Sequence, residues 1–505
     1  MIFNKRVYKS RVASLQVKWM RSRLVLLFLI IYSTISSFAQ PLRVSDNGHY
    51  LIDTEGNPFF WLGDTGWEIL HRLSRDEMDE YLADRAAKGF NLVQTVALAE
   101  HDGLNLPNAN GDVPLSDPVK VIPATTPGSD FNDPEKYDYW DHVEYFITRA
   151  GEYGLIVGLL PCWGEYVTPR FREATFTDTI LSYNYGHFLG NRYKKMDNIV
   201  WILGGDRLPI ESRDGIKIWR AMAEGITDGV SGSRSHDGKA DWEKTFMTFH
   251  CYKSTSTWFH HDSWLDMHMW GSYHEKKDNE RAYFVPQQDW NLPDPKPTIN
   301  SEPCYEDHPV NYKADLSLGI FDDFDARQAG YWSVFAGTCG HTYGCHPVWR
   351  CNTDTTDIYF LRKTWREALN DPGSFQMQHL KNLVLSRPSK NRRPDQLVLV
   401  KNPYDPTGQL QACRGDDYMM IYIPAGKQVS IYTNWLRTDK VVIWWYNPRT
   451  GKSSLVGAFT NKDFMEFDPP GKKGRGNDWV LVIDNAYKKF PPPGEAIYYP
   501  PGKNR

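Results

Sequence analysis

Short apolar runs alternate with amphipathic stretches about eight times between residues 58 and 349. The stretch 74–89 carries apolar residues at helical spacing, with Ser74 as a suitable N-cap and Gly89 as a stop signal. Repeated strand–helix alternation is typical of a (β/α)8 TIM barrel. A doubly wound sheet is the competing α/β architecture, but no glycine-rich dinucleotide-binding turn follows the first run. The expected strands lie at 58–67, 89–98, 154–163, 198–206, 245–252, 264–270, 296–306 and 340–349.

The pattern changes from about Gln396, where short strand-like segments follow one another without helices between them. Turn sequences such as "PAG" and "NPRTG" separate these segments. We therefore expect a (β/α)8 domain at 41–390 and a C-terminal antiparallel β-sandwich at 395–486. A proline-rich tail, expected to be extended, follows at 487–505.

Residues 1–40 have the features of a secretory signal peptide. Basic residues precede the apolar run Leu24–Tyr32, and small and polar residues follow it up to Gln40. The run is shorter than the ~20 residues that a spanning helix needs. No cysteine follows the expected cleavage point, so we expect no lipid anchor and no stable membrane insertion after signal removal. Met20 is an alternative start. The formal net charge of -4 gives no reason to expect a nucleic-acid partner.

The cysteines and histidines do not predict a cofactor or a metal. Seven cysteines leave at least one thiol unpaired, and Cys339, Cys345 and Cys351 are close enough for a bridge whose pair the sequence does not choose. The segment "HHDSWLDMH" at 260–268 lacks the HExxH spacing of a zinc site. No GxSxG nucleophile elbow is present either.

Polar and aromatic side chains gather where the expected strands end, which is where barrel enzymes place their active sites. Aromatic residues make up 14% of the chain. The flat apolar face and polar edge of Trp and Tyr suit sugar rings, although ordinary cores are also rich in them. Asp64 is expected either to accept a substrate hydroxyl or to cap a helix. The expected substrate-binding residues are Asp64, Trp67, Trp163, Arg207, His250, Tyr252, His268, Trp270, Tyr305, His341 and Tyr343.

Two carboxylates, Asp206 in "NIVWILGGDR" and Glu302 in "INSEPCYE", end the fourth and seventh expected strands. These strands lie across the barrel mouth from each other, and glycosidic cleavage needs two such carboxyl groups. The doublet Gly204–Gly205 would permit close approach of the backbone to a ligand. Asp206 could instead cap a helix or pair with Arg207. Glu306 ranks below Glu302 because it should lie beyond the strand.

The motifs "LGDTGWEILHRL", "RAAKGFNLVQ", "NIVWILGGDR", "SEPCYE" and "AGTCGHTYG" occur in this order and resemble glycoside hydrolase family 140. That family comprises secreted apiosidases of gut Bacteroidetes that act on the pectin rhamnogalacturonan II. The segment "WWYNPRTGK" resembles a C-terminal domain that carries a collagen-binding label in such proteins. The resemblance extends over residues 41–486, although no feature of the expected sandwich demands collagen.

The resemblance implies a retaining enzyme with Asp206 as acid/base and Glu302 as nucleophile. An aspartate in the acid/base position is unusual for the clan, where a glutamate after asparagine is commoner. The implied reaction cleaves apiosyl linkages to the galacturonan backbone, and the implied location is the periplasm or cell exterior of a Gram-negative bacterium. The alternatives are a glycosidase for another furanosyl or pectic substrate, and a secreted polysaccharide-binding protein without activity.

The implied mechanism predicts a distance between the two carboxyl groups and a pKa shift. Retaining enzymes hold the two carboxyl groups about 5–5.5 Å apart, whereas inverting enzymes separate them by roughly 6.5–9.5 Å. An acid/base at Asp206 needs a raised pKa, and the neighbouring Arg207 would oppose this unless its side chain points away. The sequence does not predict the oligomeric state.

Overall fold

The computed structural model describes residues 40–101, 103–170, 173–313, 315–353, 361–402 and 404–497. The expected signal peptide, up to residue 39, and the end of the expected tail, from residue 498, lie outside the described residues. A search of the described part found no helix with the length and apolar character needed to span a bilayer.

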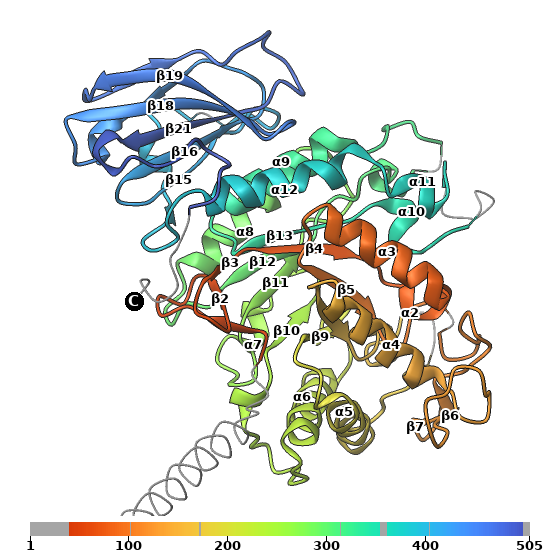
Figure 1. The fold of residues 1–505 in the computed structure, drawn as a ribbon. Coiled ribbons are helices and arrows are strands. Elements are labelled where there is room, and N and C mark those ends of the chain that lie inside the picture. Colours follow the sequence, from red (N-terminus) through yellow and green to blue (C-terminus); the bar gives the residue numbers. More distant parts are fainter. Residues whose placement is uncertain are drawn as a thin grey trace, which may run out of the picture. The chain divides into compact units, whose positions relative to one another are not determined.

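A curled parallel sheet lies at the centre of the fold (Figure 1). Its six-stranded part has the order β10-β9-β8-β5-β4-β13, and β11 pairs with β12 in a second parallel sheet. Two contacts connect the two parallel sheets. A β-bridge between Thr248 and Met267 joins β10 to the segment that enters β11. The Cys339 amide, just before β13, donates to the Thr298 carbonyl of β12 at 3.0 Å. The strands are β4 (Trp61–Thr65), β5 (Leu92–Val96), β8 (Ile156–Leu160), β9 (Ile199–Gly204), β10 (Met247–His250), β11 (His268–Gly271), β12 (Thr298–Glu302) and β13 (Gly340–Tyr343).

Each expected strand run contains or overlaps one of these strands, so the parallel α/β arrangement predicted from the sequence is confirmed. Helices follow the strands and cover the outside of the sheet (Figure 1). They are α2 (Ile69–Arg72), α3 (Arg75–Ala87), α4 (Tyr139–Glu152), α5 (Thr179–Tyr193), α6 (Gly215–Ser231), α7 (Ser256–Phe259), α8 (Arg281–Trp290), α9 (Asp323–Phe335), α10 (His346–Trp349), α11 (Trp365–Ala368) and α12 (Pro372–Leu385). Short strands outside the central sheet are β1 (Leu42–Val44), β2 (Leu51–Asp53), β3 (Pro58–Phe59), β6 (Leu115–Asp117) and β7 (Ile122–Pro123).

Local sequence explains where the main helices begin. Ser74 caps α3 and forms a capping box with Glu77, as the sequence predicted for this N-cap. Asp322 and Asp325 form the same reciprocal arrangement at the start of α9. These caps satisfy amide groups that would otherwise lack a partner in the first turn of each helix.

The C-terminal part is an antiparallel sheet domain, as predicted. Its larger sheet has six strands in the order β14-β15-β16-β21-β18-β19, and the pair β17-β20 forms a second sheet. A separate apolar core containing Ile421, Ile443 and Ile483 includes residues of both sheets. The strands are β14 (Arg393–Pro394), β15 (Gln411–Arg414), β16 (Tyr418–Ile423), β17 (Val429–Ile431), β18 (Lys440–Asn447), β19 (Lys452–Thr460), β20 (Met465–Phe467) and β21 (Trp479–Asn485).

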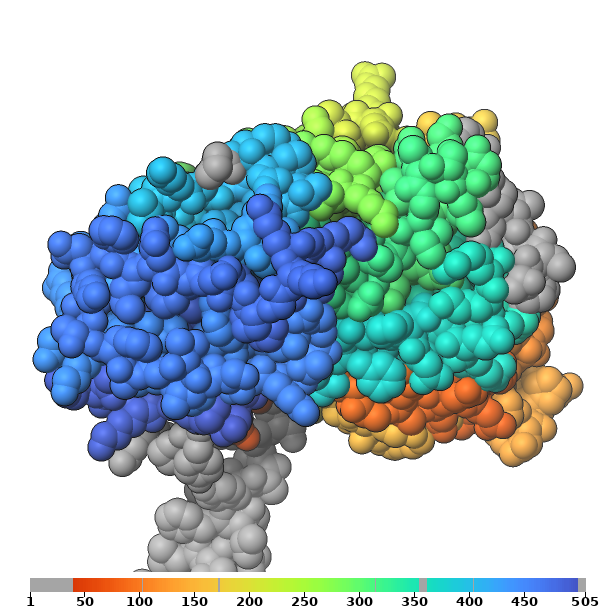
Figure 2. Space-filling view, turned by 90° about the horizontal axis from the view of Figure 1, so that it is seen from above, coloured from red at the N-terminus to blue at the C-terminus, as the bar shows by residue number. Residues whose placement is uncertain are grey.

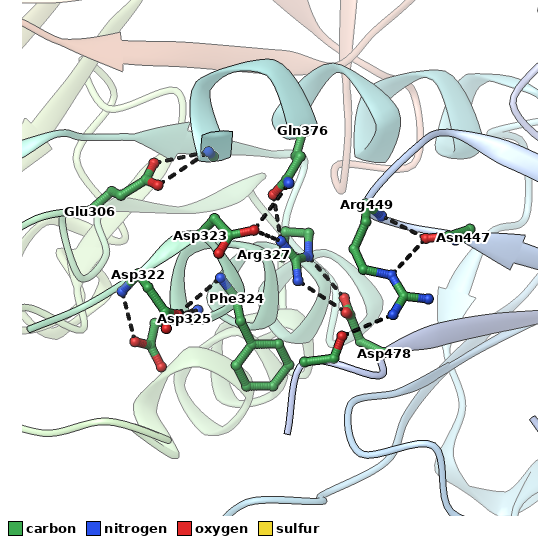
Figure 3. A network of polar contacts seen from close by, with 12 residues as sticks. Glu306, Asp322, Asp323, Phe324, Asp325, Arg327, Gln376, Asn447, Arg449 and Asp478 are labelled. Carbon is green, nitrogen blue, oxygen red and sulfur yellow. Dashed lines mark hydrogen bonds and ion pairs between the residues drawn. The ribbon is translucent and has the colours of Figure 1, made fainter. Parts of the chain in front are cut away.

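The six-stranded C-terminal sheet packs directly on helix α9, and both belong to one compact unit that begins at Gln40. The rings of Tyr331 and Tyr422 stack with centroids 4.9 Å apart. The buried Arg327 on α9 contacts Asp478 through two nitrogens, each at 3.1 Å (Figure 3). Side chains of the sheet, Tyr422 among them, belong to the same apolar cluster as the central core. The C-terminal domain therefore shares a hydrophobic core with the parallel α/β part of the chain. In space-filling view, its atoms lie directly against those of α9 and α12 (Figure 2).

All seven cysteines have free thiols. Cys339, Cys345 and Cys351 are buried and unpaired, so the bridge that the sequence left open does not form. The Cys345 thiol instead donates to Asp371 at 3.2 Å.

Candidate active site

The "GGD" sequence forms a left-handed turn where β9 ends. Gly204, Gly205 and Asp206 have φ values of 87°, 128° and 52°, a conformation that glycine adopts without strain. A Cβ at Gly204 would lie 2.3 Å from the His250 carbonyl oxygen, and one at Gly205 would lie 2.7 Å from the Gly164 nitrogen. The glycines therefore permit close contact with neighbouring protein backbone, and the earlier interpretation of close ligand approach is corrected. The turn brings Asp206 Oδ1 to 2.7 Å from the Tyr273 hydroxyl.

Glu302 is the last residue of β12 and is 5% exposed. Its Oε2 accepts a hydrogen bond from His250 Nε2 at 3.1 Å, and its Oε1 accepts one from His274 Nε2 at 3.2 Å. The Tyr305 amide donates to His274 Nδ1 at 3.2 Å, so the proton of a neutral His274 ring must be on Nε2. Both carboxylate oxygens of Glu302 thus receive a hydrogen bond from a histidine.

His250 lies between the two carboxylates. Its Nε2 is 3.1 Å from Glu302 and 3.6 Å from Asp206 Oδ1. Its Nδ1 lies 2.9 Å from the Ser301 hydroxyl, which itself donates to the Trp270 carbonyl at 3.2 Å. Burial opposes protonation of His250, but the hydrogen bond to Glu302 and the negative charges of Glu302 and the nearby Asp206 outweigh it and raise its pKa to about 9. Below that pH both ring nitrogens donate, which fits all of these contacts.

The two carboxyl groups have opposite pKa shifts. Burial opposes ionisation of Glu302, but hydrogen bonds from His250 and His274 and the charge on His250 lower its pKa to about 2. The pKa of Asp206 is raised, first by desolvation and then by the charge of Glu302. Asp206 therefore keeps its proton to a higher pH than an ordinary aspartate does, whereas Glu302 loses its proton at a lower pH than an ordinary glutamate. One oxygen of each carboxyl group and a nitrogen of His250 all lie within 4.8 Å of one another.

Arg207 does not pair with Asp206. Its guanidinium forms an ion pair with Glu211, and its Nε donates to the Thr168 carbonyl at 3.4 Å. Asp206 does not cap a helix either, because α6 begins at Gly215 with Asp214 before it. Both competing interpretations of Asp206 are therefore wrong, and Arg207 does not prevent a raised pKa.

Aromatic side chains predicted from the sequence surround His250. The ring centroids of Trp67 and Trp163 lie 5.2 Å and 6.0 Å from that of His250. Trp67 Nε1 donates to the Tyr305 hydroxyl at 3.0 Å, and the Tyr252 ring lies 5.2 Å from Tyr273. Trp67, Trp163 and Tyr305 are at most 3% exposed. These residues form the wall behind the carboxylates.

Asp64 and Tyr343 do not lie at the mouth, contrary to the expectation from sequence. Asp64 is fully buried, and its Oδ2 accepts from Tyr81 and from Arg85 Nε of helix α3. The Tyr343 hydroxyl donates to Glu306 at 2.6 Å, and Glu306 also accepts from the Gly373 amide in the first turn of α12 (Figure 3). Burial raises the pKa of Glu306 to about 8. Glu306 therefore has a structural role, which agrees with its lower rank than Glu302 as a candidate catalytic carboxylate.

The prediction of substrate binding is also corrected for three further residues. The structure places His268, Trp270 and His341 in the layer between the strands and the helices. His268 is the first residue of β11, at the end opposite the carboxylates, and burial lowers its pKa to about 3. Trp270 is fully buried and donates to Thr298 at 3.0 Å. His341 is fully buried against Gly330 of α9. Successive strand side chains point to opposite faces, and these residues occupy the face that meets the helices.

The sequence did not predict a role for Tyr273 and His274, which contact Asp206 and Glu302. They follow β11 in "WGSYH", just beyond Trp270, where the expected strand ended. Tyr273 has a φ of 54°, a left-handed conformation that nothing in the local sequence predicts. The available signal was the general rule that functional residues follow barrel strands, applied a few residues further along the chain.

The same three residues, Asp206, His250 and Glu302, also have a composition that a metal ion can use. A metal would need His250 with a deprotonated Nε2. That nitrogen donates to Glu302 at 3.1 Å, so a metal would have to displace its proton and this hydrogen bond. The arrangement favours proton transfer and nucleophilic attack, and the expectation of no metal stays a prediction.

Comparison with known proteins agrees with this chemistry. Residues 45–391 match the family model described as "Apiosidase-like, catalytic domain". Residues 393–484 match a model described as "Putative collagen-binding domain of a collagenase". Comparison with curated proteins gave no match.

Two solved structures are similar over most of their length. One, described as a glycoside hydrolase, is 31% identical with a TM-score of 0.78, covering 90% of this chain and 98% of that chain. The other is a glycoside hydrolase family 5 protein from Bacteroides vulgatus ATCC 8482. It is 32% identical with a TM-score of 0.78, covering 90% of this chain and 96% of that chain.

A curled parallel sheet with paired carboxyl groups at its strand ends, together with these relatives, defines the chain as a glycoside hydrolase. Since the matched model covers residues 45–391, the chain belongs to the apiosidase-like family.

Proposed function

We propose that the chain is a retaining endo-apiosidase of glycoside hydrolase family 140. Its substrate is the pectin rhamnogalacturonan II, in which it cleaves apiosyl linkages to the galacturonan backbone. The observation that carries the proposal is the pair Asp206 and Glu302, whose oxygens approach within 4.8 Å and whose pKa values shift in opposite directions. This approach agrees better with the carboxyl separation of about 5–5.5 Å in retaining enzymes than with roughly 6.5–9.5 Å in inverting ones.

In the first step the Asp206 carboxyl group donates its proton to the glycosidic oxygen while the Glu302 carboxylate attacks the anomeric carbon. The carbon–oxygen bond to the leaving group breaks, and a glycosyl ester forms on Glu302. In the second step Asp206, now ionised, removes a proton from water, which displaces Glu302 from the anomeric carbon. The raised pKa of Asp206 suits the first role, and the lowered pKa of Glu302 keeps the nucleophile ionised.

His250 and His274 position the nucleophile in this scheme. Each donates to one oxygen of Glu302, at 3.1 Å and 3.2 Å, so the carboxylate plane is fixed before substrate binds. Charge-assisted hydrogen bonds of this kind also stabilise the departing carboxylate in the second step.

Two further expectations belong to this proposal. We infer that the eight parallel strands close into a (β/α)8 barrel; the bridge between Thr248 and Met267 and the hydrogen bond from Cys339 to Thr298 support the closure. We also propose that the protein is exported to the periplasm or cell exterior of a Gram-negative bacterium and binds a pectic polysaccharide or oligosaccharide. Another furanosyl or pectic substrate is the alternative.

The pH profile tests the acid role of Asp206. kcat/KM should fall as the pH rises through the pKa of Asp206, because only the protonated group can donate. Tyr273 donates to the Asp206 carboxylate at 2.7 Å and thereby lowers its pKa. Tyr273→Phe removes this stabilisation, so the alkaline limb should move to higher pH by about 1 unit.

The matched control is Tyr252→Phe, since the Tyr252 ring lies beside Tyr273 at 5.2 Å without contacting Asp206. This variant should keep the wild-type limb. An unchanged limb in Tyr273→Phe, or one displaced to lower pH, would remove Asp206 from the acid role.

A chelator experiment tests the alternative use of Asp206, His250 and Glu302 as metal ligands. Turnover should persist after prolonged dialysis against EDTA, because the proposed steps use only carboxyl groups and histidines. Loss of turnover that one divalent metal restores, with the metal bound in an equimolar amount, would contradict this mechanism.

A further inference from the structure

We propose that the C-terminal sheet domain positions the catalytic loop 272–279 through a chain of ion pairs that joins Arg475, Asp325 and Lys277. Arg475 belongs to the C-terminal domain, Asp325 to the first turn of α9, and Lys277 to the loop that carries Tyr273 and His274. This inference gives the domain a role in catalysis other than binding a polymer. The predicted effect on kcat rests on the proposed function, whereas the predicted effect on the mobility of loop 272–279 does not.

Loop 272–279 needs support from its surroundings. Tyr273 and Asp278 have φ values of 54° and 52°, a region that residues other than glycine rarely adopt. Such conformations persist where surrounding contacts hold them. The loop also carries two of the residues that contact the carboxyl pair: Tyr273 bonds to Asp206 and His274 to Glu302.

Asp325 holds the loop on one side. Its Oδ2 lies 3.1 Å from Lys277 Nζ and accepts from the Asp322 amide at 2.9 Å. The Asp325 side chain is only 3% exposed, whereas that of Lys277 is 30% exposed. The loop is therefore in direct contact with the start of α9 through the Lys277–Asp325 ion pair.

Arg475 holds the same carboxylate from the other side. Its NH2 donates to Asp325 Oδ1 at 2.7 Å, and the guanidinium also forms two hydrogen bonds, each of 2.8 Å, to the carboxylate of Asp322. It lies 4.6 Å above the Phe324 ring. Figure 3 shows Asp322, Phe324 and Asp325 at the start of α9, with Asp478 of the C-terminal domain close by. Asp325 thus binds the loop through Oδ2 and the C-terminal domain through Oδ1.

Removing Arg475 should leave Asp325 with one cation and weaken the contact that orients the loop. A displacement of about 1 Å at a catalytic group can cost a factor of 10² in rate, and Tyr273 and His274 are both on this loop. Substrate contacts made elsewhere in the mouth are untouched. The effect should therefore fall on kcat rather than on KM.

The test compares Arg475→Ala, Arg475→Lys and Lys473→Ala in the full chain. Lys473 is an exposed cation of the same connection that makes none of these ion pairs, so it controls for loss of charge. Hydrogen–deuterium exchange of the peptide covering 272–279 is measured first, because it does not depend on activity. Arg475→Ala should exchange at least several-fold faster there than wild type and Lys473→Ala, with Arg475→Lys in between. Exchange at wild-type rate in Arg475→Ala would overturn the inference.

Kinetics supply the second readout. Arg475→Ala should lower kcat about tenfold with KM within twofold of wild type, and Lys277→Ala in the same background should add little further loss. Full kcat in Arg475→Ala beside an active wild type would overturn the positioning role. A wild type without turnover on any pectic glycan would overturn the proposed function instead, while the exchange data would still decide the loop contact.

Discussion

Glu302→Gln is expected to lower turnover on a pectic substrate by a factor on the order of 10⁴ or more, because the amide cannot attack the anomeric carbon. The fold should survive, since an amide oxygen can still accept from His250 or His274 in the space of the carboxylate. Binding of an uncleaved oligosaccharide, measured by calorimetry, should change far less than turnover.

The matched control is Glu306→Gln. Glu306 lies four residues further along and, with a pKa raised to about 8, is largely protonated at neutral pH, so a neutral amide resembles it. Turnover should remain within a few-fold of wild type. Equal losses in the two variants, or full activity in Glu302→Gln, would remove Glu302 from the nucleophile role.

An external nucleophile provides a second check on the same residue. In Glu302→Ala the space left by the carboxylate should admit azide, which would attack the anomeric carbon directly. The product should be a glycosyl azide with inverted anomeric configuration, detectable by NMR. The corresponding reaction in Asp206→Ala should give the retained configuration, because azide then attacks the ester on Glu302.

Arg387→Met is expected to destabilise the protein by about 3–5 kcal/mol, since it leaves a buried carboxylate unpaired. Arg387 donates to both oxygens of Asp484, at 2.8 Å and 2.7 Å, and the two side chains are 0% and 4% exposed. Arg387 follows α12 and Asp484 belongs to β21, so the pair joins the catalytic part to the C-terminal sheet. Denaturant unfolding followed by tryptophan fluorescence measures the loss.

Arg393→Met is the control for this variant. Arg393 lies 3.5 Å from Asp416 in a pair whose side chains are 36% and 59% exposed, and such surface pairs contribute about 0–1 kcal/mol. The double variant Arg387→Met/Asp484→Leu should recover much of the loss, because it removes both buried charges. A loss below about 1 kcal/mol in Arg387→Met would mean that the ion pair does not hold the two parts together.

Much of the fold could be predicted because each strand is an apolar run bounded by helix signals. The Ser74 cap and the strand ending in "GGD" are examples in which the local sequence decides the local structure. The proximity of Asp206 and Glu302 follows from the same reasoning, since the ends of parallel strands meet at one edge of the sheet.

The face that each strand residue occupies was not predicted. A one-residue shift in the assumed register moves a side chain from the mouth to the helix layer. His250 faces the inside and lies between the carboxylates. Asp64 and His341 have the opposite orientation and face α3 and α9. The loop carrying Tyr273 was missed because its left-handed backbone depends on tertiary contacts. The core shared with the C-terminal sheet was missed for the same reason, because it joins segments far apart in sequence.

The proposed hydrolysis of apiosyl linkages in rhamnogalacturonan II by Asp206 and Glu302 can be measured in one experiment. Purified rhamnogalacturonan II is incubated with the protein and, separately, with Glu302→Gln, and the products are analysed by mass spectrometry. We expect the wild type to release oligosaccharides with apiose at the new reducing end, and the variant to leave the polymer intact. An intact polymer with the wild type, or the same products with both proteins, would contradict the proposed activity.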